Sequence, residues 1–196
     1  HSGGANRHLF APPLWPALLE WALILSGRAA SSVMWVNVIV GCLMVPSVWW
    51  VGRAWFGPSA GLAAAALAAF SNVHTHYSRT ALTDPLLCLL MLWGVYFAWR
   101  AVLSGLPSRL IAAGLFAALG WWTKYNGWLT LAISGSGIAA WLVFGPGPSR
   151  EWRAALRWLV IAVIAVAAWT PVLIDLAAYG GYAAVAENHA GYFVGW

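Results

Sequence analysis

Long runs of apolar residues recur along the whole chain. Each run has roughly the length that a helix needs to cross about 30 Å of hydrocarbon at about 1.5 Å per residue. Isolated strands cannot take this role, because unpaired backbone groups are too costly in lipid. The pattern predicts an all-α, multi-pass transmembrane helical bundle with about six spans, at residues 33–51, 59–77, 85–103, 109–123, 128–144 and 155–175.

One apolar segment, Leu14–Ser26, is too short to be a span, because a helix of this length reaches only about 20 Å. It follows Pro12 and Pro13, which suit a helix start, and it contains Glu20. We expect an amphipathic helix in the outer membrane interface, with a short tilted span as the alternative. The single transmembrane domain then comprises an outer loop with this helix (1–32), the spans (33–175) and a second outer loop (176–196).

The composition agrees with a membrane protein. Only 8% of the residues are charged and 62% are hydrophobic, whereas soluble domains carry about 25% charge. The 16 Trp residues also suit a membrane interface. The chain begins with His1 rather than Met, so we expect a piece of a longer protein. Cys42 and Cys88 fall inside predicted spans, where we expect small buried apolar residues.

The charged residues orient the predicted bundle. By the positive-inside rule, the connections that carry most of the arginines are cytoplasmic. These arginines are Arg53, Arg100, Arg109, Arg150, Arg153 and Arg157. The opposite, extracytoplasmic side holds all five histidines and four of the acids, Glu20, Asp84, Asp175 and Glu187. The basic residues form no Lys/Arg run, so we expect no nucleic-acid partner.

The densest polar stretch, residues 72–85, lies where two adjacent predicted spans meet on the outer side of the membrane. Ionisable groups near membrane depth commonly mark a functional site, which favours His76, Arg79 and Asp84. Two structural alternatives stay open: Arg79 and Asp84 form an interfacial ion pair, or Thr83 or Asp84 caps the next helix. At two residues' separation on a helix, His74 and His76 point to different faces, so we expect hydrogen bonding rather than metal binding.

Lys124 is the sole lysine and lies among aromatic residues at an outer helix end. It is either a snorkelling membrane anchor or a cation for an anionic phosphate, for which an ammonium serves as a compact point charge. Farther along, Glu187 and His189 occupy the last outer loop. They are either substrate contacts or part of a plain solvated loop.

Taken in order, these polar stretches resemble the polytopic C-type glycosyltransferases of family 39. That group includes protein O-mannosyltransferases and lipid A aminoarabinose transferases, which use a dolichyl- or undecaprenyl-phosphate sugar. The resemblance rests on five pieces: Ala11-Pro-Pro-Leu14, Gly52-Arg-Ala-Trp-Phe-Gly57, Tyr77-Ser-Arg-Thr-Ala-Leu-Thr-Asp84, Gly120-Trp-Trp-Thr-Lys124 and Glu187-Asn-His189.

The resemblance implies a membrane glycosyltransferase that moves a sugar from a polyprenyl-phosphate donor to a lipid, glycan or protein acceptor. It implies a cell-membrane protein whose active face is extracytoplasmic, which is periplasmic in a bacterium. Asp84 is then proximal to the active site, and the substrate-binding residues are Lys124, Arg79, His76, Glu187 and His189. No cofactor is assigned, although the resemblance leaves a divalent metal open.

The chain departs from the family pattern in one respect. The resemblance implies a catalytic carboxylate in the first outer loop, upstream of the Pro-Pro-Leu element. Residues 1–13 contain neither Asp nor Glu. Either this carboxylate precedes His1, or the protein is not a standard member of the family.

Two other classes of protein remain as alternatives. Transporters place ionisable groups near the bilayer midplane, commonly on broken helices. In this sequence the acids map to span ends or loops, although Pro46 could break one helix. A non-catalytic membrane scaffold is the other alternative.

Overall fold

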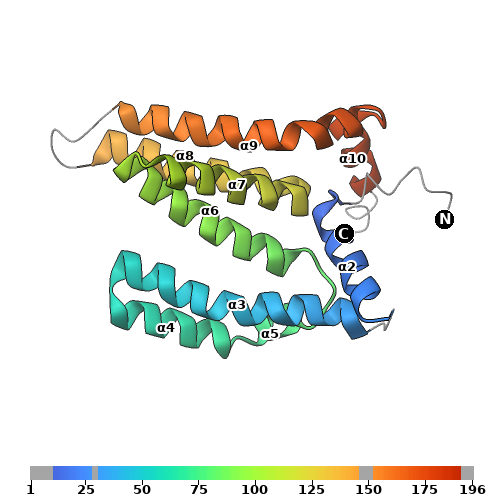
Figure 1. The fold of residues 1–196 in the computed structure, drawn as a ribbon. Helices are drawn as coiled ribbons and strands as arrows, with labels where there is room; N and C mark the ends of the chain where they lie inside the picture. The colour runs from blue at the N-terminus through green and yellow to red at the C-terminus, as the bar shows by residue number, and fades with distance from the viewer. Residues whose placement is uncertain (1–10, 28–30, 146–151, 191–196) are drawn as a thin grey trace.

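The computed structural model describes residues 11–27, 31–145 and 152–190. Within these ranges every regular element is a helix, which confirms the predicted all-α membrane bundle (Figure 1). The α-helices are α2 (Leu14–Leu25), α3 (Ser31–Phe56), α4 (Pro58–Ala69), α5 (Asn72–Ser78), α6 (Asp84–Ser104), α7 (Pro107–Thr123), α8 (Leu129–Phe144), α9 (Arg153–Ala177) and α10 (Gly181–Ala190), with a 3-10 helix η2 (Tyr125–Trp128) before α8.

Four segments are long and apolar enough to cross a membrane: α3, α6, α9 and the continuous run Tyr125–Phe144. The other two predicted spans are shorter helices, since α7 has 17 residues and α4 has 12. The continuous helix expected over 59–77 is wrong. The Ser71 side chain accepts a hydrogen bond from the backbone N–H of His74, and this cap starts a separate helix, α5.

Helix α6 is the centre of the bundle. It packs against α3 on one side and against α7, α8 and α9 on the other (Figure 1). Small side chains dominate the buried contacts, so the helix backbones approach closely, as is typical of membrane bundles. This core comprises Ala98, Ala101, Val102, Ala113, Ile138, Ala154 and Ile161.

Helices α3 and α4 form a tight hairpin. Gly57 turns the chain with a φ of 94°, and Pro58 begins α4. A Cβ atom at Gly61 would lie 2.6 Å from the backbone nitrogen of Arg53 and 2.7 Å from the carbonyl oxygen of Trp49. The two backbones can therefore be this close only because position 61 is glycine.

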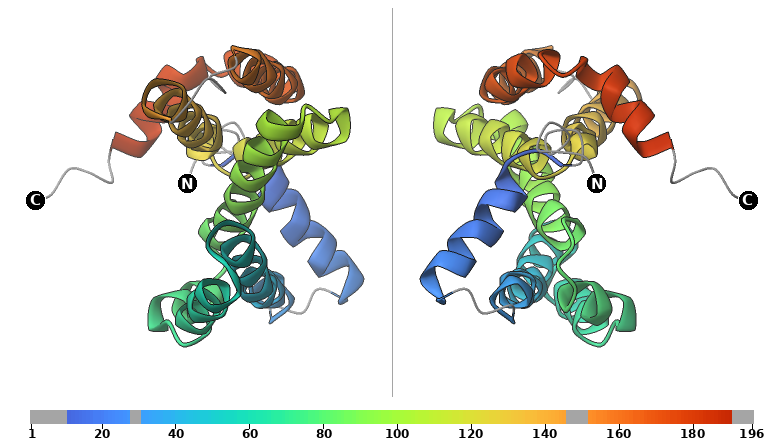
Figure 2. Two further views of the ribbon diagram at one scale, coloured as in Figure 1. Left: turned by 90° about the vertical axis from the view of Figure 1, so that its left-hand side faces the viewer. Right: turned by 90° about the vertical axis from the view of Figure 1, so that its right-hand side faces the viewer.

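Helix α2 crosses one end of the bundle and diverges from the long helices (Figure 2). It packs on α3 and α7, and its Trp15 is buried with Val40, Leu86 and Leu90. The helix itself was predicted, and its location in the membrane interface stays a prediction. At the other terminus, residues 181–190 form α10, a helix that we did not predict within the expected outer loop.

The two cysteines lie on the surface of the bundle. Cys42 and Cys88 are both free and exposed, so the expectation that they are buried is wrong. The physical reason is that lipid and protein interior are similarly apolar. An apolar residue in a span can therefore face either one.

Candidate functional site

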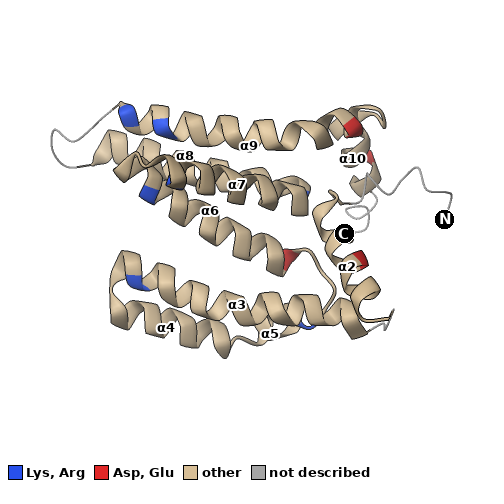
Figure 3. Ribbon diagram, in the orientation of Figure 1, with Lys and Arg blue, Asp and Glu red and all other residues tan. Residues whose placement is uncertain are grey.

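Charge is sorted between the two ends of the bundle (Figure 3). The acidic positions gather at the end where α2 crosses and α10 begins, and most arginines lie at the opposite end. Asp84 occupies the first turn of α6, whereas Arg53 occupies the last turn of α3. Which end faces the cytoplasm stays a prediction.

An ion pair joins two predicted site residues at the acidic end. The Nζ atom of Lys124 lies 2.8 Å from Oδ1 of Asp84, and their side chains are 39% and 41% exposed. A hydrogen bond between two charged groups is stronger than a neutral one. The sequence singled out both residues but did not predict that they pair. The described residues contain no ion pair between Asp84 and Arg79, which was the structural alternative.

Lys124 is placed by the end of α7. Its backbone is extended, and the chain then reverses through η2, with the Gly127 N–H donating to the Lys124 carbonyl at 2.8 Å. A Cβ atom at Gly127 would overlap the backbone of Gly120 and Trp121. The close approach of η2 to α7 therefore requires glycine at position 127 and fixes where the lysine leaves the helix.

Asp84 is placed by the start of α6. Thr83 precedes it and makes no side-chain cap, so the Thr83 capping alternative is not found, and Pro85 lies in the first turn. A carboxylate in the first turn of a helix is favoured by the helix dipole. The ammonium of Lys124 adds a second favourable interaction from the end of α7.

Asp84 also lines a cavity of about 380 Å³ between α3, α5 and α6. His74 and Tyr77 contribute polar groups to its wall, and Met44, Val73 and Cys88 contribute apolar ones. The Nε2 atom of His74 lies 3.2 Å from the Gly41 carbonyl oxygen. The sequence did not indicate His74 or Tyr77 as wall residues, because the fold of α5 against α3 brings them there.

A second cavity, of about 540 Å³, lies between α2, η2 and α9. Tyr125, the residue after Lys124, lines it together with Glu20 and Asp175. The rest of the wall consists of prolines and aliphatic residues, including Pro16 and Pro171. Carboxylate oxygens and a phenol can accept hydrogen bonds from hydroxyl groups, so this wall has chemistry suited to a polar ligand.

The other predicted site residues lie on different elements. His76 and Arg79 line an open depression of about 390 Å³ along α5, together with Asn72, Thr75 and Thr80. Glu187 and His189 lie on α10, where the His189 ring nitrogen Nδ1 is 2.7 Å from the Val185 carbonyl oxygen. The ion pair thus joins Asp84 to Lys124, and the other four predicted residues are not part of it.

An aromatic cluster attaches the start of α10 to the turn that carries Lys124. Trp121 stacks on Trp169 at 5.0 Å between ring centroids, and its Nε1–H donates to the Tyr182 hydroxyl at 2.9 Å. The Tyr125 and Tyr182 rings are 5.8 Å apart. Burial raises the pKa of the Tyr182 phenol, so this hydroxyl stays neutral at physiological pH.

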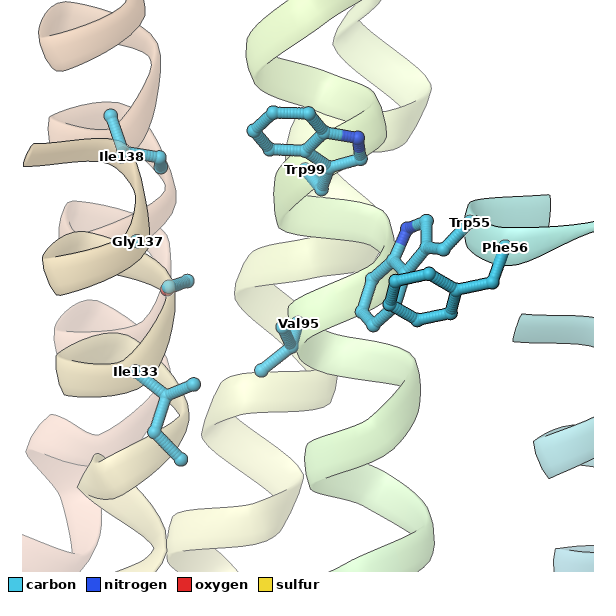
Figure 4. A pocket seen from close by; sticks show the side chains of 8 residues that line it. Trp55, Phe56, Val95, Trp99, Ile133, Gly137 and Ile138 are labelled. Carbon is cyan, nitrogen blue, oxygen red and sulfur yellow. The ribbon is translucent and has the colours of Figure 1, made fainter. Parts of the chain in front are cut away.

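A third cavity is apolar. It has a volume of about 350 Å³ and lies between α6, α8 and the end of α3 (Figure 4). Its wall carries no charged side chain and includes Trp55, Phe56, Trp99 and Ile133. Such a wall suits a hydrocarbon chain rather than charge-dependent chemistry.

Metal ligands do not cluster within the described part of the chain. None of its residues form a group of three or more His, Cys, Asp or Glu side chains that could hold a metal ion.

Comparisons with known proteins place the chain in a family. No curated protein and no solved structure matches it. The family model described as dolichyl-phosphate-mannose-protein mannosyltransferase matches residues 11–174, a range that includes both Asp84 and Lys124. Membership of this family implies membrane glycosyltransferase activity of the C-type. The chain belongs to the dolichyl-phosphate-mannose-protein mannosyltransferase family.

Proposed function

We propose that the protein transfers a sugar from a polyprenyl-phosphate donor to an acceptor hydroxyl at the acidic end of the bundle. The observation that carries this proposal is the half-exposed ion pair between Lys124 and Asp84. It places a cation at a helix end in a chain that has no other lysine. Asp84 lines one cavity, and Tyr125, the residue after Lys124, lines another. The acceptor is a lipid, a glycan or a protein.

Lys124 binds the donor phosphate in this proposal. An ammonium has three N–H donors, and the contact with Asp84 uses one of them. The other two can reach phosphate oxygens while Asp84 holds the side chain in place. Charge builds on the phosphate as the sugar leaves, so a fixed cation stabilises the transition state more than the bound donor.

The transfer breaks the bond between the anomeric carbon and the phosphate oxygen, and it forms a bond from that carbon to the acceptor oxygen. The acceptor proton goes to a carboxylate acting as general base, and the phosphate leaves with the polyprenyl chain. By resemblance to the family, this base belongs to the first outer loop, upstream of Pro12. We therefore assign Asp84 to orienting Lys124 beside the reaction.

The membrane explains the architecture of such an enzyme. A polyprenyl chain stays among the lipid tails, while its phosphate must reach a polar site at the membrane surface. The four long apolar helices provide the embedded part, and the Lys124–Asp84 pair lies at the end of two helices. By the positive-inside rule, we place this end on the extracytoplasmic face of the cell membrane.

A transporter is the rival class. Its ion-binding groups would be expected near the middle of broken helices. Helix α3 instead continues through Pro46 from Ser31 to Phe56, and Asp84 and Lys124 lie at helix ends. This placement favours the enzyme.

The test mixes a polyprenyl-phosphate sugar with the full-length protein and candidate acceptors, and it measures the products over time. We expect release of polyprenyl phosphate and a glycosylated acceptor. Asp84→Asn keeps the size of the side chain and removes its charge, so turnover should fall while the protein still inserts and folds. Donor that stays chemically intact but moves between leaflets would support the transporter. Full activity of Asp84→Asn would reduce Asp84 to a structural role.

A further inference from the structure

A buried amide holds the connection between α5 and α6. Asn37, on α3, is fully buried, with 0% exposure. Its Nδ2 group donates to the Leu82 carbonyl at 2.8 Å and also donates to the Thr80 carbonyl. The Oδ1 atom has no hydrogen-bond partner among the described residues, so the two N–H bonds orient the amide.

The contact extends one turn along α3. Gly41 lies four residues after Asn37, on the same face of the helix. A Cβ atom at Gly41 would overlap the Ser78 side chain. The Gly41 carbonyl oxygen lies 3.2 Å from Nε2 of His74. The end of α5 and the following connection are thus pressed directly against α3.

The chemistry of the amide fits this task. The connection over residues 79–83 is not helical. Its Thr80 carbonyl accepts a backbone hydrogen bond from the Leu82 N–H at 2.8 Å, so the Asn37 amide gives Thr80 a second partner and supplies the Leu82 carbonyl with a donor from another helix. An amide NH₂ has two donors, which matches the two carbonyls of Thr80 and Leu82. A hydroxyl offers one donor and an apolar side chain offers none.

The position of the hydrogen bonds from Asn37 to the Thr80 and Leu82 carbonyls indicates a role in the site. Leu82 is two residues before Asp84, and Asp84 begins α6. Fixing the Leu82 carbonyl against α3 therefore fixes where the Asp84 carboxylate stands. That carboxylate in turn holds Lys124 from a segment 40 positions later in the chain.

We propose that Asn37 is a positioning residue for glycosyl transfer, acting through Asp84 to hold Lys124. The kinetic part of this inference rests on the proposed function. The geometric part, that Asn37 maintains the ion pair, does not depend on it. The experiment therefore measures the ion pair and the turnover separately.

The state of the ion pair is monitored through the rate at which Lys124 is acylated in the full-length protein. Mass spectrometry of the peptide that contains Lys124 measures the extent of acylation. A paired ammonium must leave its carboxylate and lose a proton before it reacts. We expect Asn37→Leu and Asp84→Asn to speed acylation by about two- to fivefold, as suits a half-exposed pair. Acylation of Asn37→Leu at the wild-type rate would overturn the inference, whether or not the protein consumes any donor.

Ser47→Ala is the matched control on the same helix. Ser47 is buried and accepts a hydrogen bond from Nε1 of Trp93 on α6 at 3.0 Å. Its loss also removes a buried contact between α3 and α6, but it lies away from the connection. We expect wild-type acylation of Lys124 in Ser47→Ala, and faster acylation there would contradict a specific role for Asn37.

Turnover supplies the second readout. A small displacement of a catalytic geometry is costly, so Asn37→Leu should slow the release of polyprenyl phosphate by about tenfold or more. Combined with Lys124→Gln, it should add little further loss, because both changes act on one unit. Losses that multiply would show an independent structural effect.

Asn37→Ser keeps one hydrogen-bond donor and provides a second test in case Asn37→Leu folds poorly. We expect it to lie between the wild type and Asn37→Leu in both acylation and turnover. Wild-type acylation and turnover in a folded Asn37→Ser, together with an unfolded Asn37→Leu, would overturn the inference. Absence of turnover in the wild type would overturn the proposed function and leave the acylation result to decide the geometry.

Discussion

Lys124 and Asp84 are two of the few charged side chains in this chain, and each stands out in the sequence for that reason. An ionisable group beside apolar spans is costly to place, so its presence indicates a site or an anchor. Their pairing could not be predicted. The two residues are separated by 40 positions, and their contact depends on how the start of α6 and the end of α7 align along the bundle.

The first prediction separates phosphate binding from membrane anchoring at Lys124. Lys124→Arg keeps the charge and a long apolar stem, so an anchor should tolerate it. A planar guanidinium is bulkier than an ammonium and has a different donor geometry, so a confined phosphate contact should suffer. We expect a several-fold loss in kcat/KM for the lipid donor. Kinetics of Lys124→Arg that cannot be distinguished from the wild type would return the lysine to the role of anchor.

The long helices could be predicted because their apolar runs have the length of a membrane crossing. The runs do not reveal local competition for backbone hydrogen bonds. Residues 59–77 are apolar enough to look continuous, but the Ser71 cap divides them into α4 and α5. Helix α10 was missed because a short alanine-rich segment has helix propensity without a long apolar run.

The second prediction concerns the reversal between α7 and η2. Gly127→Ala introduces a Cβ atom that overlaps the backbone of Gly120 and Trp121, which cannot rotate away. Overpacking of this kind costs about 1–3 kcal/mol. It should also displace Lys124, three residues earlier. We expect a lower thermal midpoint in detergent and lower turnover.

Gly137→Ala is the control on helix α8. A Cβ atom there meets nothing within 4 Å, and the position is helical. Alanine in place of helical glycine should stabilise the protein by about 0.5–1 kcal/mol. Equal destabilisation by Gly127→Ala and Gly137→Ala would show that the close approach at position 127 is not the cause.

At the scale of the whole molecule, the bundle separates acids from most arginines. The charge pattern of the sequence predicted this separation, and the fold places the two groups at opposite ends (Figure 3). The cavities could not be predicted, because their walls combine residues from three or more elements. Glu20, Tyr125 and Asp175, for example, come from α2, η2 and α9.

The third prediction fixes the orientation of the bundle. Single cysteines are introduced at exposed positions Ser108, near the start of α7, and Ala186, on α10, in a background where Cys42 and Cys88 are alanine. In intact cells or spheroplasts, an impermeant maleimide should label Ala186→Cys and spare Ser108→Cys until the cytoplasmic side is exposed. The reverse pattern would place the acidic end in the cytoplasm.

The central claim is that sugar transfer from a lipid phosphate takes place at the end of the bundle where Lys124 meets Asp84. The most direct measurement is the rate of polyprenyl-phosphate release by the full-length protein in vesicles that contain the donor. Lys124→Gln removes one charge at the acidic end, and Arg100→Gln removes one at the opposite end. A lost charge-assisted hydrogen bond costs about 1.5–3 kcal/mol, so Lys124→Gln should slow release roughly ten- to a hundredfold. Arg100→Gln should leave the rate close to that of the wild type. No loss in Lys124→Gln, or an equal loss in both variants, would contradict the account.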